Sequence, residues 1–376
     1  MVFRSRHNFC REVKTCKIHD LLHELCLREA QSENFMFVSP HSRQVCPKEC
    51  YRTIVQSICD FDGTISYPFD PKKIRTFIYS GEMLVKDLNI DRLFGFRILS
   101  LMRVMSLGNL SYHLGNYPIR PSYFVHLRYL SLEIRNRPAF PHIPKLHNLQ
   151  SLIVHMGSSR YDYSFISLDI SMLPQLRSLH FVKKRGPSFP LIMLSVQMKH
   201  TVLEHLHTVT GVPSKLCTNE IFANMPNLKK LGIQYDEEHG IKSPSSDLSC
   251  LLVAQGLEKN IFPPTLKKLT LVRPHFPWEA TDIVGTILPY LEALKLKNYA
   301  CAGDEWKPVA GGFSLLKFLS LECIRFTKWI ATDENFPVLE RLSIAMDADD
   351  QIVMRSSMRI KLQNLWSWNI KLVSKI

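Results

Sequence analysis

Leu291-Glu292-Ala293-Leu294-Lys295-Leu296 is followed, 25 residues later, by Leu316-Lys317-Phe318-Leu319-Ser320-Leu321, with apolar residues at the same first, fourth and sixth positions. This pattern recurs twelve times, at intervals of 22 to 38 residues. Its copies begin at Ile74, Met102, Leu127, Leu149, Leu176, Leu203, Leu228, Leu266, Leu291, Leu316, Leu339 and Leu365. Apolar residues that alternate with exposed ones predict a short strand. We therefore expect one strand in each copy.

A single copy of this pattern is too small to fold alone. Burying three Leu-sized side chains stabilises a copy by about 5–9 kcal/mol, whereas ordering about 25 residues costs about 25–50 kcal/mol of backbone entropy. The copies must therefore stack on one another. The pattern and its spacing are those of leucine-rich repeats. They predict an α/β solenoid of about 12 irregular repeats, whose parallel strands line the concave face of an arc.

Prolines mark the entry to several copies. Pro174, Pro226, Pro264, Pro289 and Pro337 each stand two residues before the first leucine of a copy. Proline has no amide donor and disfavours the helical region for its predecessor. We expect each of them to end the preceding segment and to start the strand.

Composition narrows the functional class. The 376 residues carry a net charge of +13, yet no basic run reaches five residues and no DNA or RNA motif occurs, so nucleic acid is not an expected partner. No signal-peptide core or 20-residue apolar stretch is present. The ten cysteines lack paired spacing, which favours a reducing compartment. We expect a cytoplasmic protein without an integral membrane segment, and peripheral association with membranes stays open.

The amino-terminal segment differs from the repeats. The run from Ile18 to Cys26, IHDLLHELC, reads as a helix with Asp20 as its cap. Leu21, Leu22, Leu25 and Cys26 fall on one face of this helix, which predicts that the face is buried.

The run VKTCKIHDLLHELCLREA, residues 13–30, resembles the end of the nucleotide-binding module of plant NLR immune receptors. It is most similar to the coiled-coil class, and within it to the late blight resistance proteins of nightshades. The resemblance continues through residues 294–298, Trp306, residues 311–313 and the segment from Trp329 to Pro337.

The resemblance implies three parts: a winged-helix tail at residues 1–32, a linker or amino-terminal cap at 33–70, and the repeat domain at 71–376. The family's Met-His-Asp-type motif falls on Ile18, His19 and Asp20. In the family, His19 would reach the β-phosphate of ADP and Asp20 would hold the closed form together. ADP or ATP is therefore implied for a full-length member. This chain has no G-x-x-x-x-G-K-[ST] loop, so we expect no cofactor in it.

The same segment offers a metal site as an alternative. Cys16, His19, His23 and Cys26 have spacings that suit a zinc site of two cysteines and two histidines. Cys26 lies on the predicted apolar stripe, however, and the resemblance accounts for His19 without a metal. We therefore expect no metal site.

Recognition is expected at the outward positions of the strands. Four histidines, His155, His180, His205 and His207, are predicted on three adjacent strands. They could bind a metal or sense pH, but polar recognition residues are the preferred interpretation. Six basic residues are predicted to form a stripe that steers an acidic partner, although strand positions facing water simply need to be polar. They are Lys230, Lys268, Lys295, Lys297, Arg341 and Lys371.

The sequence contains no recognisable catalytic motif, so we expect an interaction protein and not an enzyme. The resemblance implies a plant innate-immunity protein that recognises a pathogen effector or a guarded host protein. It also implies that the repeats restrain a nucleotide-switch (NB-ARC) domain, in cis or in trans, that is missing from this chain. A substrate adaptor of a ubiquitin ligase and a non-signalling truncated decoy are the alternatives.

Overall fold

The structure, a computed structural model, describes residues 2–7, 13–18, 20–39, 50–55, 73–79, 101–107, 124–134, 143–156, 165–183, 191–195, 202–235, 262–273, 276–323, 328–345, 352–356 and 370–373. It divides into two compact units, Met1–His205 and Leu206–Ile376.

The first unit opens with a hairpin and a helix. Strands β1 (Val2–His7) and β2 (Val13–Ile18) pair antiparallel, and α1 (Asp20–Ser32) follows them and packs against β3 (Phe37–Ser39). The predicted helix is confirmed, but its burial is not. Leu21 is 72% exposed, Leu25 is 49% exposed, and Cys26 is exposed as well. The prediction that Cys26 is a core residue is wrong, because the described residues leave this face of α1 open.

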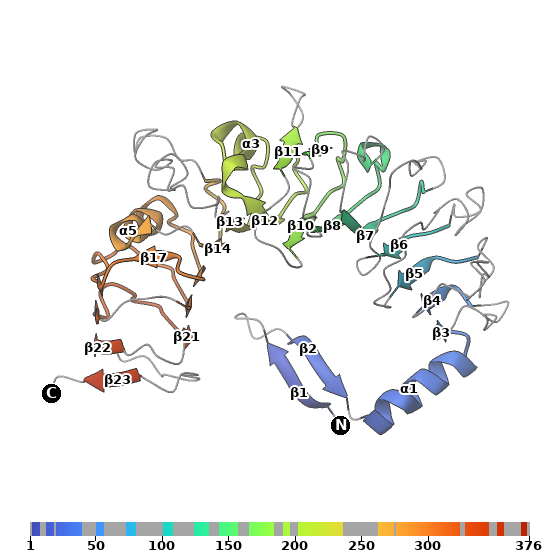
Figure 1. The fold of residues 1–376 in the computed structure, drawn as a ribbon, viewed down its shortest axis with the longest axis horizontal. Helices are drawn as coiled ribbons and strands as arrows, with labels where there is room; N and C mark the ends of the chain where they lie inside the picture. The colour runs from blue at the N-terminus through green and yellow to red at the C-terminus, as the bar shows by residue number, and fades with distance from the viewer. Residues whose placement is uncertain are drawn as a thin grey trace. The chain divides into compact units, whose positions relative to one another are not determined.

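A ladder of parallel strands fills the rest of the first unit (Figure 1). It runs from β3 through β4 (Arg52–Val55), β5 (Thr76–Tyr79), β6 (Val104–Ser106), β7 (Tyr129–Ile134) and β8 (Ser151–Met156) to β10 (Ser178–Lys183). The predicted strands are confirmed. The ladder also begins earlier than predicted, since β3 and β4 lie in the segment 33–70 that was expected to be a linker or cap. In β4 the fully buried Thr53, which pairs with Phe77 of β5, occupies an inward position where the pattern requires an apolar residue.

The second unit has a ladder of the same kind. It comprises β12 (Thr208–Pro213), β13 (Lys230–Gln234), β14 (Lys268–Val272), β16 (Ala293–Lys297), β19 (Phe318–Glu322) and β21 (Arg341–Ala345). From β13 to β21 the residues pair one to one, without a register shift. Equivalent positions of successive repeats therefore lie side by side.

Strand β12 corrects one predicted copy. Thr208 pairs with Lys230, so this copy begins at Leu206 and not at Leu203. The register shifts between Val209 and Val212, where Gly211 has a φ of 72°. An extra residue in a strand, with glycine in the left-handed region, is a β-bulge. The bulge lets Val212 return to the inner face, where it is buried.

The chain returns on the other side of each unit through short elements. The first unit has the parallel pair β9 (Phe165–Asp169) and β11 (Leu191–Ser195) and the 3-10 helix η3 (Ile143–Lys145). The second unit has the 3-10 helix η4 (Ser214–Leu216) and the helices α3 (Asn219–Ala223) and α5 (Trp278–Ile287). It also has the parallel pair β15 (Phe276–Pro277) and β17 (Cys301–Ala302). Its four-stranded sheet consists of β18 (Glu305–Trp306), β20 (Lys328–Ala331), β22 (Ile352–Ser356) and β23 (Ile370–Val373). The predicted leucine-rich-repeat solenoid is thus confirmed.

Several strands of the two ladders are entered through a tight turn. The amide of Leu291 donates to the carbonyl of Leu288, three residues earlier, at 3.0 Å, and the amide of Leu339 donates to Phe336 at 3.2 Å. Pro289 and Pro337 occupy the second position of these turns, where the fixed φ of proline fits. The residues at both ends of each turn are buried. The expected role of the prolines is confirmed, and it lies in the turn as much as in stopping the preceding segment.

The core lies between the ladder and the returning elements. In β8 and β14, buried and partly exposed residues alternate, with the leucines inward. In the second unit the far side of the core is aromatic: Trp278 stacks on Trp306 at a ring-centroid distance of 4.6 Å, and Phe336 lies edge-on to Trp306 at 5.9 Å. These rings join successive turns of the solenoid.

Candidate functional site

The one-to-one pairing arranges the outward residues of the second unit in three rows that cross its strands. The first row is Lys230, Lys268, Ala293, Phe318 and Arg341. The second is Gly232, Thr270, Lys295, Ser320 and Ser343, and the third is Gln234, Val272, Lys297, Glu322 and Ala345. These rows form the candidate recognition surface of this unit.

The predicted basic stripe does not form as one feature. Lys230 and Lys268 are direct neighbours in the first row. Ala293 and Phe318, only 2% and 8% exposed, then separate them from Arg341. An outward position can therefore be buried, which alternation along a single strand does not reveal.

Lys295 explains why Phe318 is covered. Its ammonium lies 5.4 Å from the centre of the Phe318 ring on the neighbouring strand. A cation over an aromatic face is attracted by the ring quadrupole, and the lysine stem covers apolar surface on its way there. Lys295 is thus part of a packed patch on β16 and β19.

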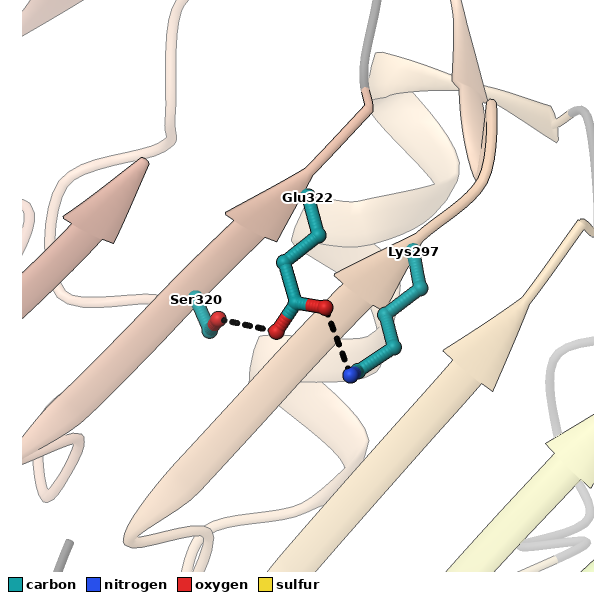
Figure 2. A network of polar contacts seen from close by, with 3 residues as sticks. All are labelled: Lys297, Ser320 and Glu322. Atoms are coloured by element: carbon teal, nitrogen blue, oxygen red, sulfur yellow. Dashed lines mark hydrogen bonds and ion pairs between the residues drawn. The ribbon is translucent and has the colours of Figure 1, made fainter. Parts of the chain in front are cut away.

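Lys297 is charge-compensated. Its Nζ lies 2.6 Å from Oε2 of Glu322, its cross-strand neighbour, while the hydroxyl of Ser320 donates to the other carboxylate oxygen at 3.1 Å (Figure 2). Both charged side chains are about one-third exposed. The pair contributes little net charge to the surface, so Lys297 is a poor candidate for steering an acidic partner.

Lys371 lies elsewhere. It belongs to β23, where it pairs with Val353 of β22 in the sheet that also contains β18 and β20. The prediction that Lys371 continues the stripe is wrong. Residues 365–369 of the copy at Leu365 lie outside the described residues, and β23, which follows them, joins the sheet of β18, β20 and β22 and not the ladder.

The histidines do not gather on three strands as predicted. His155 on β8 and His180 on β10 are offset, since His180 pairs with Ile153 and His155 pairs with Val182. His205 and His207 precede β12 and are not strand residues. The prediction fails there because the copy begins at Leu206.

His155 has a polar neighbour on the adjoining strand. Its Nε2 lies 3.1 Å from the hydroxyl of Ser131 on β7, and the ring tautomer decides which group donates. Among the described residues, no three His, Cys, Asp or Glu side chains are arranged to hold a metal ion. His155 and His180 are best described as polar residues of the first unit's outward face.

The nucleotide-binding positions are only partly visible. His19 lies outside the described residues, and Asp20 is the first residue of α1, directly after β2. A helix start offers free amides and the positive end of the helix dipole to a phosphate. Nucleotide contact by these two residues stays a prediction.

Two thiols in the second unit are unsuited to covalent chemistry. Burial raises the pKa of Cys301 to about 12, and it also raises the pKa of Cys217. The thiolate is the reactive form of cysteine, so both side chains stay protonated at neutral pH. They serve as small core residues.

No family model matches this sequence. It is 26% identical over 356 residues to a putative late blight resistance protein homolog of Solanum demissum, covering 88% of this chain and 27% of that protein. It is also 26% identical over 400 residues to the probable disease resistance protein RXW24L of Arabidopsis thaliana, covering 99% of this chain and 42% of that protein. The chain is similar to plant disease-resistance proteins. The predicted resemblance to late blight resistance proteins is thereby confirmed.

The chain spans less than half the length of these relatives, 27% and 42%. Among solved structures, TLR13 in its complex with ssRNA13 matches with a TM-score of 0.23 and 12% identity, over 88% of this chain and 68% of that one. The fold assignment rests on the strand pairing and not on this weak match. None of the helices that the structure describes is long and apolar enough to cross a membrane.

Proposed function

We propose that this chain is the recognition part of a plant disease-resistance protein, and that it binds a pathogen effector or a guarded host protein with the outward residues of its ladders. The observation that carries the proposal is the separation of roles within each strand. Inward positions repeat as buried leucine or isoleucine, whereas the partly exposed outward positions change from Val272 to Lys297 to Glu322 along the third row. A constant scaffold with a changing face suits the binding of macromolecules.

The proposed action is binding and not catalysis. Lys297 is paired with Glu322, Lys295 lies over the Phe318 ring, and the buried thiols are held protonated. The proposal places the protein in the cytoplasm, in keeping with a sequence that lacks paired cysteine spacings.

The restraint of a nucleotide-switch domain is the second half of the proposal. It is supported by the exposed apolar side chains of α1, Leu21 and Leu25. Exposed apolar patches on a helix commonly mark a surface that another domain covers. ADP or ATP would then be held mainly by that domain, with His19 and Asp20 as one wall of its site.

The test uses a full-length receptor that contains this region, expressed in leaves and challenged with the pathogen. Lys230→Glu reverses an exposed charge in the first row, and Lys145→Glu makes the same change on η3, outside the ladder. We expect Lys230→Glu to weaken pathogen-dependent cell death and Lys145→Glu to leave it unchanged. Equal responses from both variants and from further outward-row variants would contradict recognition by this face.

The restraint is tested separately. A nucleotide-binding domain from a relative, expressed as its own polypeptide, is expected to co-purify with this chain, and Leu21→Ser/Leu25→Ser is expected to abolish the co-purification. Recovery of a ubiquitin-ligase scaffold in its place would favour the adaptor alternative.

A further inference from the structure

A row of residues lies immediately before the strands of the first unit. From its second member on, each backbone amide of this row donates to the carbonyl of the equivalent residue one turn earlier, at 2.8 or 2.9 Å. We call it the entry row, and it consists of Tyr51, Arg75, Arg103, Arg128, Gln150 and Arg177. Four of its six members are therefore arginines in register on successive turns.

The four arginines form a charged edge that only Gln150 interrupts. Arg75, Arg103, Arg128 and Arg177 are all exposed. Neighbouring parallel strands lie about 4.8 Å apart, so the backbones of Arg75 and Arg177, four steps apart, are separated by about 19 Å. Like charges at this spacing repel one another.

The described part of the first unit does not neutralise these charges. Arg75 lies over the ring of Tyr51 at 4.9 Å, and none of the four arginines forms an ion pair with a described carboxylate. The ion pair of Arg28 with Glu24 lies on α1, away from the entry row. The guanidinium groups of the entry row are thus available to a ligand.

In the second unit, acidic residues balance the positive charges at the equivalent position. Its equivalent row is His207, Lys229, Lys267, Glu292, Lys317 and Glu340. Acidic and basic residues alternate along its later part, and Lys267 pairs with Glu292 at 2.8 Å. The repeat architecture therefore does not require a basic residue at this position. The run of arginines is particular to the first unit.

We propose that the arginines of the entry row bind an extended, acidic segment of a partner protein. This deepens the proposed recognition function and rests on it. A guanidinium group can hold a carboxylate through two parallel hydrogen bonds. An extended segment of about six residues spans about 19 Å, so a stretch rich in Asp and Glu would reach from Arg75 to Arg177.

The surroundings favour carboxylates over the phosphates of a nucleic acid. Single-stranded nucleic acids are held by exposed aromatic rings on which the bases stack, besides basic residues. Beside the described entry row, Arg75 occupies one face of the Tyr51 ring, which is 40% exposed, and the side chain of Tyr129 is half-buried. The row thus supplies charge and hydrogen-bond donors but few stacking surfaces.

The probe is a fluorescein-labelled peptide of eight residues in which Glu and Ser alternate, titrated with the full chain and followed by fluorescence anisotropy. A Gln-Ser peptide and a single-stranded RNA of ten uridines serve as comparison ligands. We expect the acidic peptide to bind more tightly than either of them. Its affinity is expected to fall between about 50 and 150 mM salt because the contacts are ionic.

The test variant is Arg103→Gln/Arg128→Gln, since glutamine already occupies this position at Gln150. The matched control is Lys229→Gln/Lys317→Gln, which removes two charges from the same position in the second unit. Both variants lower the net charge from +13 to +11. We expect the arginine variant to weaken peptide binding by about tenfold or more, and the control by less than about twofold. Arg103→Lys/Arg128→Lys keeps the charge but cannot form the two parallel hydrogen bonds. We expect its affinity for the peptide to lie between those of the Arg103→Gln/Arg128→Gln variant and the control.

Three results of the peptide titrations would overturn the proposal: no binding of the acidic peptide, tighter binding of the RNA, or an equal loss in the lysine control. The arginine variant is also introduced into the full-length receptor. Pathogen-dependent cell death that persists without the arginines would overturn the role of the entry row and leave recognition by the outward rows intact. Failure of the proposed function itself is read from the Lys230→Glu comparison, which leaves these arginines untouched.

Discussion

Trp306 stacks on Trp329 with ring centroids 5.6 Å apart and ring planes 9° from parallel. The two residues pair across β18 and β20 and come from successive turns of the second unit. Both side chains are fully buried, and Trp278 stacks on the opposite face of Trp306. The central ring therefore contacts the turn before it and the turn after it.

Replacing this central ring should destabilise the second unit strongly. Trp306→Ala is expected to lower the free energy of unfolding by about 3–5 kcal/mol, because it leaves a cavity between two rings. Trp306→Phe keeps part of the stack and should cost less. Urea denaturation followed by near-ultraviolet circular dichroism measures the loss. A change below about 1 kcal/mol for the alanine variant would show that the stack is not a stabilising contact.

Gly285 has no room for a side chain. A Cβ at this position would lie 2.6 Å from the carbonyl oxygen of Gly312 and 2.9 Å from the ring of Phe313. Gly285→Ala should therefore destabilise the protein by about 1–3 kcal/mol through overpacking, although alanine favours a helix by about 1 kcal/mol. Thr286→Ala, on the exposed face of α5, serves as the control and should change stability by about 0.5 kcal/mol or less. A stabilised Gly285→Ala variant would contradict the close approach.

Asp282 should make stability depend on pH. Burial raises its pKa from 3.8 to about 6, partly offset by the amide of Val309 and the nearby indole of Trp306, while the charge of Glu279 adds to the rise. A raised pKa contributes stability that is fully present below the unfolded-state value and is lost as the pH rises through about 6.

Asp282→Asn removes this loss. Relative to the wild type, the variant should gain about 1–2 kcal/mol of stability between about pH 4.5 and about pH 7.5, a value reduced from the full shift because the carboxyl group is only half-buried. Denaturation at both pH values gives the difference. An identical effect of the substitution at the two pH values would rule out a raised pKa.

The Lys297–Glu322 pair should be weakly coupled and sensitive to salt. Both side chains are about one-third exposed, and ion pairs of this kind contribute about 0.2–1 kcal/mol. A double-mutant cycle with Lys297→Ala and Glu322→Ala should give a coupling energy in this range that shrinks in about 1 M salt. A coupling energy of several kcal/mol, unchanged by salt, would mean that the pair is desolvated in solution.

Much of the ladder could be predicted because the sequence of each strand shows which of its residues point into the core. Leu269 and Leu271, or Leu294 and Leu296, alternate with polar residues, and a strand exposes only every second residue to water. All of the repeats from Leu228 to Leu339 are in the expected register. The strands of the hairpin and of the returning elements carry no such repeat pattern.

The copy near Leu203 shows where the pattern is ambiguous. Leu203, Leu206 and Val209 are spaced by three and are all buried, so the template fits two frames equally well. The bulge at Gly211 goes with the second frame, and the spacing of the leucines does not predict this bulge. The first frame places His205 and His207 on the strand, whereas in the structure both precede it.

The composition of the surface depends on pairs of repeats. Glu322 occupies in its own repeat the position that Lys297 occupies in the preceding one, and Phe318 and Ala293 are related in the same way. Each strand taken alone predicts two exposed lysines on β16. An alignment of neighbouring repeats shows which residues become cross-strand neighbours. It therefore indicates the ion pair, the buried phenylalanine and the row of arginines.

The carbonyl of Arg103 accepts the amides of both Arg128 and Tyr129, at 2.8 and 3.0 Å, and the same fork recurs at the carbonyls of Lys229, Lys267, Glu292 and Lys317. The entry to these strands is thus held by main-chain hydrogen bonds, whatever side chain the residue carries. Substitutions at these edge positions should cost little in folding. The residues of the entry row could therefore be replaced one by one in the course of evolution while the scaffold stays intact.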